Sequence, residues 1–247
     1  MTHILVDTAN TFFRARHVIR GNTSEKIGMA IHITMNSIKK AWADFDGSHL
    51  IFCLEGRSWR KDHYAAYKRN RKDAIEALTP QEKEENDVFW ECYDDFCKFI
   101  KEKTNATVLQ NPRAEADDLI ARWIDSAYPG VRTKGTKNKI GLQEAFADRN
   151  AKGYTWNNLM LSKWVDADGK EHRVLDDYER NRLLVDLHAQ PDAIIEELDQ
   201  TIDQAKAENK NISQVGIRFM KFCGKYDLQR ISEQAQLYVE PFNARLQ

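Results

Sequence analysis

The chain has no apolar run near the roughly 18 residues that a membrane-spanning helix needs, and no basic segment followed by an apolar stretch at its N-terminus. We therefore expect neither a membrane protein nor a secreted one. Its four cysteines contain no Cys-x-x-Cys pair, and its histidines show no metal-ligand spacing. The cysteines are therefore expected to be reduced core thiols of a cytoplasmic protein. No internal repeat or low-complexity stretch interrupts the 247 residues, which are enough to bury a sizeable core.

Charge of one sign is not in excess either, because the formal net charge is −1. The distribution is nevertheless uneven. Residues 57–72 carry seven cations and one anion, and residues 132–139 carry four cations and no acid. A nearly neutral total thus hides two basic patches, and a polyanion responds to such patches rather than to the total.

Acidic residues follow three strand-like apolar runs, at residues 3–6, 50–54 and 106–109. The acids that close or follow these runs are Asp7, Glu55, Glu115 and Asp117. In a parallel sheet all carboxyl ends lie along one edge, so these acids are expected to converge there. Such a cluster repels itself unless a divalent cation binds, and hard oxygen ligands suit Mg²⁺ or Mn²⁺. The pattern predicts a metal-dependent phosphoryl-transfer site.

Each acidic motif taken alone also has a structural explanation. Asp7 can cap the segment that follows its strand, and Glu115, Asp117 and Asp118 suit the first turn of a helix, where the helix dipole favours negative charge. The combination of acids after three separate strands is what favours the metal site.

Apolar periodicity predicts amphipathic helices over residues 24–44 and 80–103. Together with the three strands, they indicate an α/β fold with a parallel sheet up to residue 126. Beyond a boundary at about residue 126, the pattern is mostly helical, with one hairpin between residues 159 and 174. We therefore expect an α/β core over residues 1–126 and a helical module over residues 127–247.

Aromatic side chains are interleaved with the cations of residues 57–72, at Trp59, Tyr64 and Tyr67. Cations hold phosphates and aromatic rings stack on bases, a combination that grips single strands. The alternative is a solvated helix face.

The glycines and lysines of residues 130–141 predict a tight turn with backbone N–H groups and cations facing an anion; the alternative there is a flexible polar linker. Asp166 and Asp168 are expected to be turn residues.

Four blocks in this order resemble the 5′-nuclease (flap endonuclease) family, in particular the bacteriophage 5′→3′ exonucleases also described as ribonuclease H. The blocks are Ile4-Leu5-Val6-Asp7-Thr8-Ala9-Asn10, Glu55 through Tyr67-Lys68-Arg69-Asn70-Arg71, Ala114-Glu115-Ala116-Asp117-Asp118, and Gly130 to Gly141. The resemblance implies a PIN-like parallel-sheet nuclease core with a basic arch at residues 57–72. It also implies a helix–three-turn–helix (of the helix-hairpin-helix class) at residues 127–149, which binds duplex DNA and often K⁺.

By position, the resemblance implies that Asp7, Glu55, Glu115 and Asp117 hold Mg²⁺ or Mn²⁺, with Asp118 a ligand or its neighbour. It places Lys68 and Arg71 beside the scissile phosphate, as catalytic residues together with Asp117. Tyr67 would stack on a terminal base. The nucleic-acid contacts that it implies are Arg14, Arg57, Arg60, Lys61, Tyr67, Lys68, Arg69, Arg71, Arg132, Lys134, Lys137 and Lys139.

The implied function is a divalent-metal-dependent 5′→3′ exonuclease or flap endonuclease. It would act on DNA flaps or RNA–DNA hybrids with a 5′ single-stranded end, as in primer removal beside replication proteins. We expect a monomer in the cytoplasm, which is the host cytoplasm if a phage encodes it.

The sequence departs from the family pattern after the third block. The family continues into a strand that ends in Asp-x-Asp and later into a Gly-Asp-x-x-x-Asp turn, and these acids complete a second metal site. Here residues 123–126 run directly into residues 127–130 with neither motif. The loss of a strand would leave a gap in the sheet that another element must close.

This departure leaves a second hypothesis, a catalytically impaired protein that binds branched or single-stranded nucleic acid and has lost its second metal site. A third hypothesis is a metal-dependent ribonuclease or phosphatase that shares only the acidic edge.

Overall fold

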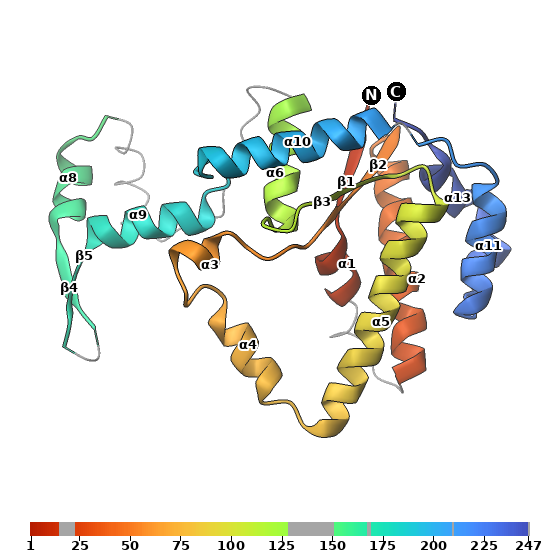
Figure 1. Cartoon of the computed structure of the whole chain (residues 1–247), viewed down its shortest axis with the longest axis horizontal. Helices are drawn as coiled ribbons and strands as arrows, with labels where there is room; N and C mark the ends of the chain where they lie inside the picture. The colour runs from red at the N-terminus through yellow and green to blue at the C-terminus, as the bar shows by residue number, and fades with distance from the viewer. Residues whose placement is uncertain (15–22, 128–150, 167–168, 209, 247) are drawn as a thin grey trace. The chain divides into compact units, whose positions relative to one another are not determined.

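The computed structural model describes residues 1–14, 23–127, 151–166, 169–208 and 210–246 (Figure 1). The chain forms two compact units: unit 1 comprises Met1–Trp123 and Asp192–Gln247, and unit 2 comprises Ile124–Pro191. The first segment of unit 1 ends close to the predicted boundary at residue 126. The prediction placed residues 192–247 in the second module, however, and the structure assigns them to unit 1.

The sheet of unit 1 has three described strands, β1 (His3–Asp7), β2 (His49–Leu54) and β3 (Thr107–Gln110). All pairs are parallel, and β2 lies in the middle. Every residue of β2 is buried, which explains why this strand reads as a continuous apolar run rather than an alternating one. The predicted α/β core with a parallel sheet is therefore present.

The two long predicted helices are confirmed as α2 (Thr23–Asp44) and α5 (Pro80–Lys103). Helix α2 connects β1 to β2, after the short α1 (Thr8–Arg14), and α5 leads into β3. The start of α5 is fixed locally. Thr79 Oγ1 accepts from the Glu82 amide and the Glu82 side chain accepts from the Thr79 amide, with proline in the first turn.

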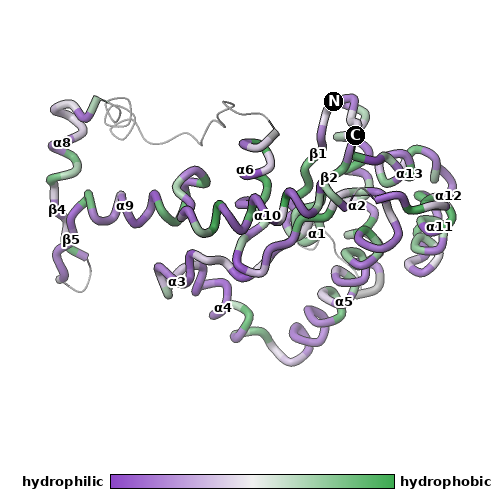
Figure 2. The backbone as a smooth tube through the Cα atoms, turned by 45° about the horizontal axis from the view of Figure 1, so that its top comes forward, coloured by the Kyte–Doolittle hydropathy of each residue, from purple (hydrophilic) through white to green (hydrophobic). Residues whose placement is uncertain are grey.

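Between β2 and α5 the basic stretch forms two short helices, α3 (Arg60–His63) and α4 (Arg69–Glu76). Figure 2 shows this part of the backbone as largely hydrophilic, and α4 has no buried residue. Helix α4 therefore has no buried apolar face.

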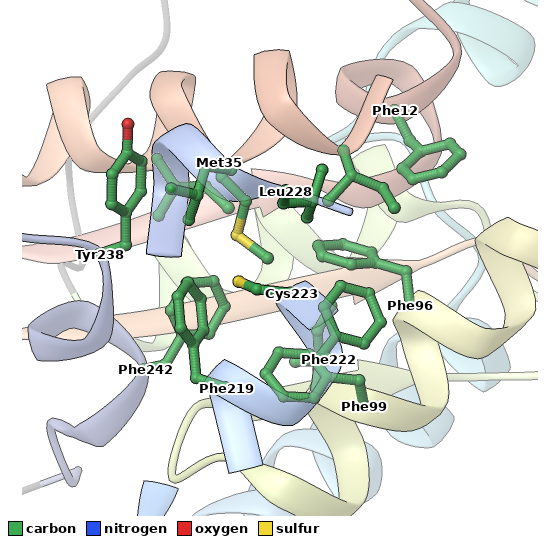
Figure 3. Packing of buried hydrophobic residues seen from close by; sticks show 14 of the residues in the cluster. Phe12, Met35, Phe96, Phe99, Phe219, Phe222, Cys223, Leu228, Tyr238 and Phe242 are labelled. Atoms are coloured by element: carbon green, nitrogen blue, oxygen red, sulfur yellow. The ribbon is translucent and has the colours of Figure 1, made fainter. Parts of the chain in front are cut away.

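The C-terminal segment supplies α10 (Asp192–Glu208), α11 (Val215–Lys225), α12 (Gln229–Glu233) and α13 (Ala235–Asn243). Its aromatic side chains enter the core of unit 1, where Phe222 stacks on Phe99 at 4.4 Å between ring centroids (Figure 3). Phe242 stacks on Phe52 at 6.0 Å between ring centroids. Large buried aromatics dominate core energetics, so this packing is why residues 192–247 belong to unit 1.

Helix α10 packs against β3 and against the segment that follows it. Asn111 Nδ2 donates to Thr201 Oγ1 at 3.2 Å, and Arg122 of α6 (Ala116–Ala127) makes a bidentate pair with Asp199 at 2.5 and 2.7 Å. An element from late in the chain thus packs against β3.

Unit 2 contains α8 (Tyr154–Leu161), the antiparallel hairpin of β4 (Lys163–Val165) and β5 (Glu171–Arg173), and α9 (Val174–Val185). The hairpin lies where the sequence predicts it. Asp166 accepts from the Lys170 amide at 2.9 Å, and Gly169 has φ of +80°, as expected of a turn. The predicted helix–three-turn–helix lies almost wholly outside the described residues. No helix in the described part of the chain has the length and apolar character to span a bilayer.

Candidate metal and nucleic-acid site

Asp7 and Glu55 come to the same edge of the sheet because their strands are parallel and in register. Asp7 ends β1 level with Cys53 of β2, and Glu55 follows β2 directly. Each also meets the start of a helix: the Asn10 amide donates to Asp7 Oδ1 at 3.0 Å, and the Ala116 amide donates to Glu55 Oε2 at 3.3 Å. Glu55 therefore brings the end of β2 to the N-terminus of α6.

The acids of β1, β2 and α6 influence one another electrostatically. Desolvation by the surrounding protein raises the pKa of Asp7; the Asn10 amide lowers it and the charge of Asp117 raises it again. Desolvation likewise raises the pKa of Glu55, which the Ala116 amide lowers and the charges of Asp7 and Glu115 raise. These mutual effects on pKa are consistent with the prediction that Asp7, Glu55, Glu115 and Asp117 converge at one edge of the sheet.

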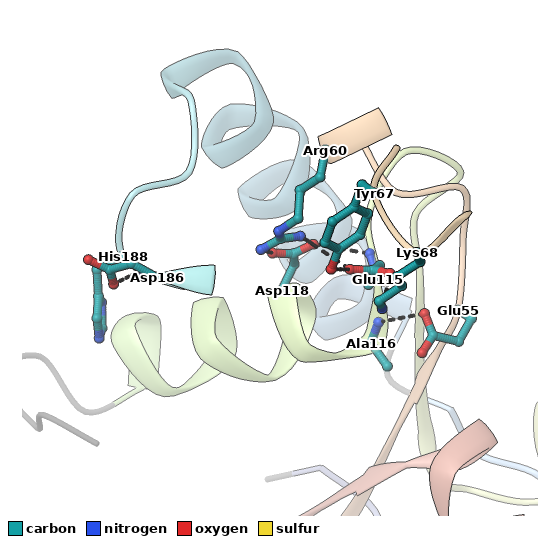
Figure 4. A network of polar contacts seen from close by, with 9 residues as sticks. All are labelled: Glu55, Arg60, Tyr67, Lys68, Glu115, Ala116, Asp118, Asp186 and His188. Atoms are coloured by element: carbon teal, nitrogen blue, oxygen red, sulfur yellow. Dashed lines mark hydrogen bonds and ion pairs between the residues drawn. The ribbon is translucent and has the colours of Figure 1, made fainter. Parts of the chain in front are cut away.

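Glu115 is held by two residues of the basic stretch (Figure 4). Tyr67 Oη donates to Glu115 Oε2 at 2.9 Å, and Lys68 Nζ forms an ion pair with Glu115 Oε1. Lys68 is 29% exposed, so this cation borders solvent as well as the acids. Sequence reasoning missed this pairing because the partners are 47 and 48 residues apart and no local pattern links them.

Asp118 is paired with Arg60, and both are buried. Arg60 Nη1 and Nη2 donate to the two Asp118 oxygens at 2.7 Å each, and Asp118 Oδ2 also accepts from the Glu115 amide at 3.1 Å. The Arg60 side chain is 2% exposed and that of Asp118 is fully buried. We predicted Arg60 as a contact for nucleic acid; the structure instead places it inside, where it neutralises an acid.

The structure differs from two expectations about the acidic edge. Only a bound cation was expected to offset the repulsion among the acids, yet Arg60 and Lys68 supply positive charge to Asp118 and Glu115 directly. In addition, the described residues contain no group of three His, Cys, Asp or Glu side chains arranged to hold a metal ion.

A backbone clamp joins the loop after β2 to the loop after β3. The amides of Gly56, Arg57 and Trp59 donate to the carbonyl oxygens of Ala114, Pro112 and Arg113 at 2.9, 2.9 and 2.8 Å. A Cβ on Gly56 would lie 2.0 Å from the Asn111 carbonyl oxygen, so only glycine permits this approach. The clamp fixes Glu55 beside the first turn of α6.

The remaining cations of the stretch lie on the surface. Arg57 pairs with Asp62 at 2.7 Å, and Lys61, Arg69 and Arg71 are exposed. A cavity of about 430 Å³ opens beside Glu115, and its cationic lining is Lys61, Lys68, Arg71 and Lys72. Arg14 is exposed at the end of α1. Arg132, Lys134, Lys137 and Lys139 lie outside the described residues.

Residues 2–134 match the sequence model of the 5′-3′ exonuclease, N-terminal resolvase-like domain. The chain belongs to this family. The resemblance of the four sequence blocks is thereby confirmed, and the three-stranded parallel sheet is the α/β nuclease core of a 5′-3′ exonuclease domain.

Two curated relatives of this 5′-3′ exonuclease domain are flap endonucleases Xni. The protein of Aeromonas hydrophila is 30% identical over 172 residues, covering 67% of this chain and 58% of the relative. That of Aeromonas salmonicida is 29% identical over 174 residues, covering 68% and 60%. The chain thus spans less than two thirds of the length of these relatives.

Two solved structures of bacteriophage T5 proteins are similar at greater distance. They are the 5′-exonuclease with bound zinc and a flap endonuclease complex with DNA and metal ions. Each is 15% identical with a TM-score of 0.39; the matches cover 97% and 98% of this chain and 89% and 88% of the T5 chains. A likeness at this level does not assign residue roles.

The donor chemistry of this exonuclease domain fits a hard divalent ion. Asp7 is half-buried, Glu55 and Asp117 are exposed, and their carboxylate oxygens are the ligands that such ions prefer. Glu115 and Asp118 differ from these three because Lys68 and Arg60 already neutralise them. Asp7, Glu55 and Asp117 therefore offer donor atoms of the right kind, but in the described residues they do not already surround one ion position.

Proposed function

We propose that the chain is a 5′→3′ nuclease that hydrolyses phosphodiester bonds in DNA flaps or RNA–DNA hybrids with Mg²⁺ or Mn²⁺. The proposal is supported by the in-register parallel strands that bring Asp7 and Glu55 to one edge of the sheet, and by the cavity that Glu115 lines together with cations of residues 57–72, in a chain that belongs to the 5′-3′ exonuclease family. Carboxylates suit the ion and cations suit the polyanionic strand, so both halves of the chemistry lie together.

In this proposal the side chains of Asp7, Glu55 and Asp117 would move together to hold the ion, and Glu115 would exchange its contact with Lys68 for the ion. The chemistry that a divalent ion supplies at such a site is activation of water and neutralisation of charge on the phosphodiester oxygens. Lys68 and Arg71 line the cavity beside Glu115, and there they orient a phosphate and stabilise its developing charge. The hydroxyl of Tyr67 binds Glu115, and its ring lies beside Lys68.

The test is a labelled 5′-flap DNA and a matched RNA–DNA hybrid, incubated with Mg²⁺ or Mn²⁺. Wild-type chain should release short 5′ products. Asp117→Asn removes the negative charge of an exposed acid at nearly constant shape and should lower the rate by roughly 100-fold or more. Cleavage at the wild-type rate by Asp117→Asn would contradict the proposed site.

A second candidate function is a catalytically impaired protein that binds branched or single-stranded nucleic acid. The observation that favours it is the pairing of Glu115 and Asp118 with Lys68 and Arg60, which leaves fewer acids for ions. Binding to the flap without cleavage in either metal would support this candidate against the nuclease.

Both candidates need the cations of the basic stretch. Lys68→Glu and Arg71→Glu should each weaken flap binding and lower the steepness of its salt dependence, because fewer counterions are released. Lys40→Glu on α2 is the matched control, since Lys40 is 75% exposed and outside the stretch. Equal salt slopes for all three variants would contradict the predicted nucleic-acid contact.

A further inference from the structure

Arg60 differs from every other cation of residues 57–72, a stretch that the structure describes completely. Its side chain is 2% exposed, whereas Lys68 is 29% exposed and Arg57 is 69% exposed. A buried charge requires a partner with good geometry. Arg60 therefore has a role inside the protein rather than at the surface that meets a polyanion.

The partner geometry of Arg60 is that of a fixed fork. Both of its terminal nitrogens donate to the two oxygens of Asp118 at 2.7 Å, and Nη1 also lies 3.4 Å from Glu115 Oε2. The guanidinium lies over the ring of Trp59, itself 1% exposed, at 4.5 Å from the ring centroid. A planar guanidinium suits both contacts at once, and a lysine ammonium would satisfy neither as well.

Asp118 links Arg60 to the segment that carries Glu115 and Asp117. It lies in the first turn of α6, and its Oδ2 accepts from the amide of Glu115. Glu55 accepts from the next amide, that of Ala116. The start of α6 is thus held on one side by Asp118 with Arg60 and on the other by Glu55, so the direction in which Glu115 and Asp117 project depends on the Arg60–Asp118 pair.

The geometry points to Arg60 as a positioning residue of the divalent-ion site, which acts through Asp118 and does not contact nucleic acid. Asp118 then serves chiefly to hold Arg60 and the first turn of α6. The inference rests on the proposed function, because it concerns the same ion. It divides the basic stretch into one internal cation that shapes the acidic edge and several surface cations that face the substrate.

The experiment measures Mn²⁺ binding to the full chain by isothermal titration calorimetry without nucleic acid, and flap binding in EDTA without metal. Arg60→Lys keeps the charge but loses the fork, and it should weaken Mn²⁺ binding roughly 10- to 100-fold, the usual effect of removing a group that orients metal ligands. Its flap affinity in EDTA should stay within roughly twofold of wild type, because no phosphate contact is lost.

Lys61→Ala is the matched control, from the adjacent and exposed position. It should show the reverse behaviour, with weaker flap binding in EDTA and unchanged Mn²⁺ affinity. The double variant Arg60→Lys with Asp118→Asn should bind Mn²⁺ no more weakly than the weaker single variant, since both changes break one pair. Additive losses would show that Arg60 does not act through Asp118.

Circular dichroism confirms that each variant is folded. If Arg60→Lys is not, the double variant Arg60→Gln with Asp118→Asn replaces it, because it leaves no buried charge unpaired, with the same expected loss of Mn²⁺ affinity. Wild-type Mn²⁺ affinity in the folded Arg60 variant, or flap binding weakened as in Lys61→Ala, overturns the positioning role alone. A wild-type chain that binds no Mn²⁺ overturns the proposed function and this inference with it.

Discussion

At the carboxyl edge of the sheet, the acids that follow β3 pair with cations, whereas at the amino ends of β1 and β2 histidines form hydrogen bonds with neutral partners. His49 Nε2 lies 2.7 Å from Thr107 Oγ1, and Trp123 Nε1 donates to His3 Nδ1 at 3.2 Å. Burial lowers the pKa of His49 to about 4, and the charges of His3 and Lys210 contribute in the same direction. His49 is therefore neutral at pH 7.

The two ends of the sheet thus differ in how partly buried ionisable groups avoid an unpaired charge. At the amino end the ionisable group gives up its charge, which avoids desolvating an ion. At the carboxyl end the charges are kept, and Arg60 and Lys68 balance part of them. Retaining charge in a partly buried place is costly, and at the carboxyl end this cost is met by pairing buried acids with cations.

The largest expected effect is on the charged pair. Asp118→Ala leaves Arg60 buried without its main partner and should lower the free energy of unfolding by about 3–5 kcal/mol. Thr107→Val at the opposite end removes a neutral hydrogen bond and should cost only about 1 kcal/mol. Urea denaturation of both variants measures the difference. Equal losses of stability would mean that the charged pair at one end contributes no more than the neutral hydrogen bond at the other.

The next effect concerns pH. The pKa of His49 is about 4 in the folded protein and about 6.5 when unfolded, so the unfolded chain binds the proton first as pH falls. Stability should therefore decrease between about pH 6.5 and pH 4, by about 3 kcal/mol for this group. His49→Gln should flatten the profile over that window. An unchanged slope in urea denaturation across pH would show that another group is responsible.

A smaller effect separates the two glycines that flank β2. Gly56→Ala places a Cβ 2.0 Å from a backbone oxygen, whereas Gly47→Ala meets mainly the ring of Trp42, at 2.6 Å. A side chain can move more readily than a clamped backbone, so Gly56→Ala should lose about 3 kcal/mol and Gly47→Ala about 1 kcal/mol. Thermal melting of the pair tests this order, and the reverse order would place the tighter constraint at the amino end.

Local patterns in the sequence predicted the elements that position the site. The two strands before Asp7 and Glu55 were predicted from short apolar runs that stop at an acid. The helices now seen as α2 and α5 were predicted from their apolar period. The acidic edge followed from the parallel pairing alone. The metal-ligand and nucleic-acid roles of these residues stay predictions.

Two features of the structure could not be predicted from local sequence patterns. The fork of Arg60 on Asp118 joins residues 58 positions apart, and in the sequence Arg60 looks like any cation of its stretch. The return of residues 192–247 to unit 1 depends on which core the apolar faces of α11 and α13 meet. Periodicity shows that a helix has a buried face, but not what covers it.

The stacking of Phe242 on Phe52 has a consequence for folding during synthesis. During synthesis the central strand leaves the ribosome long before the ring that covers it, and the intervening unit 2 must be made first. Until then the side of Phe52 that Phe242 covers stays exposed, and exposed apolar surface in a nascent chain favours aggregation. We expect slow completion of the native state, because closing contacts across so much chain carries a large entropic barrier.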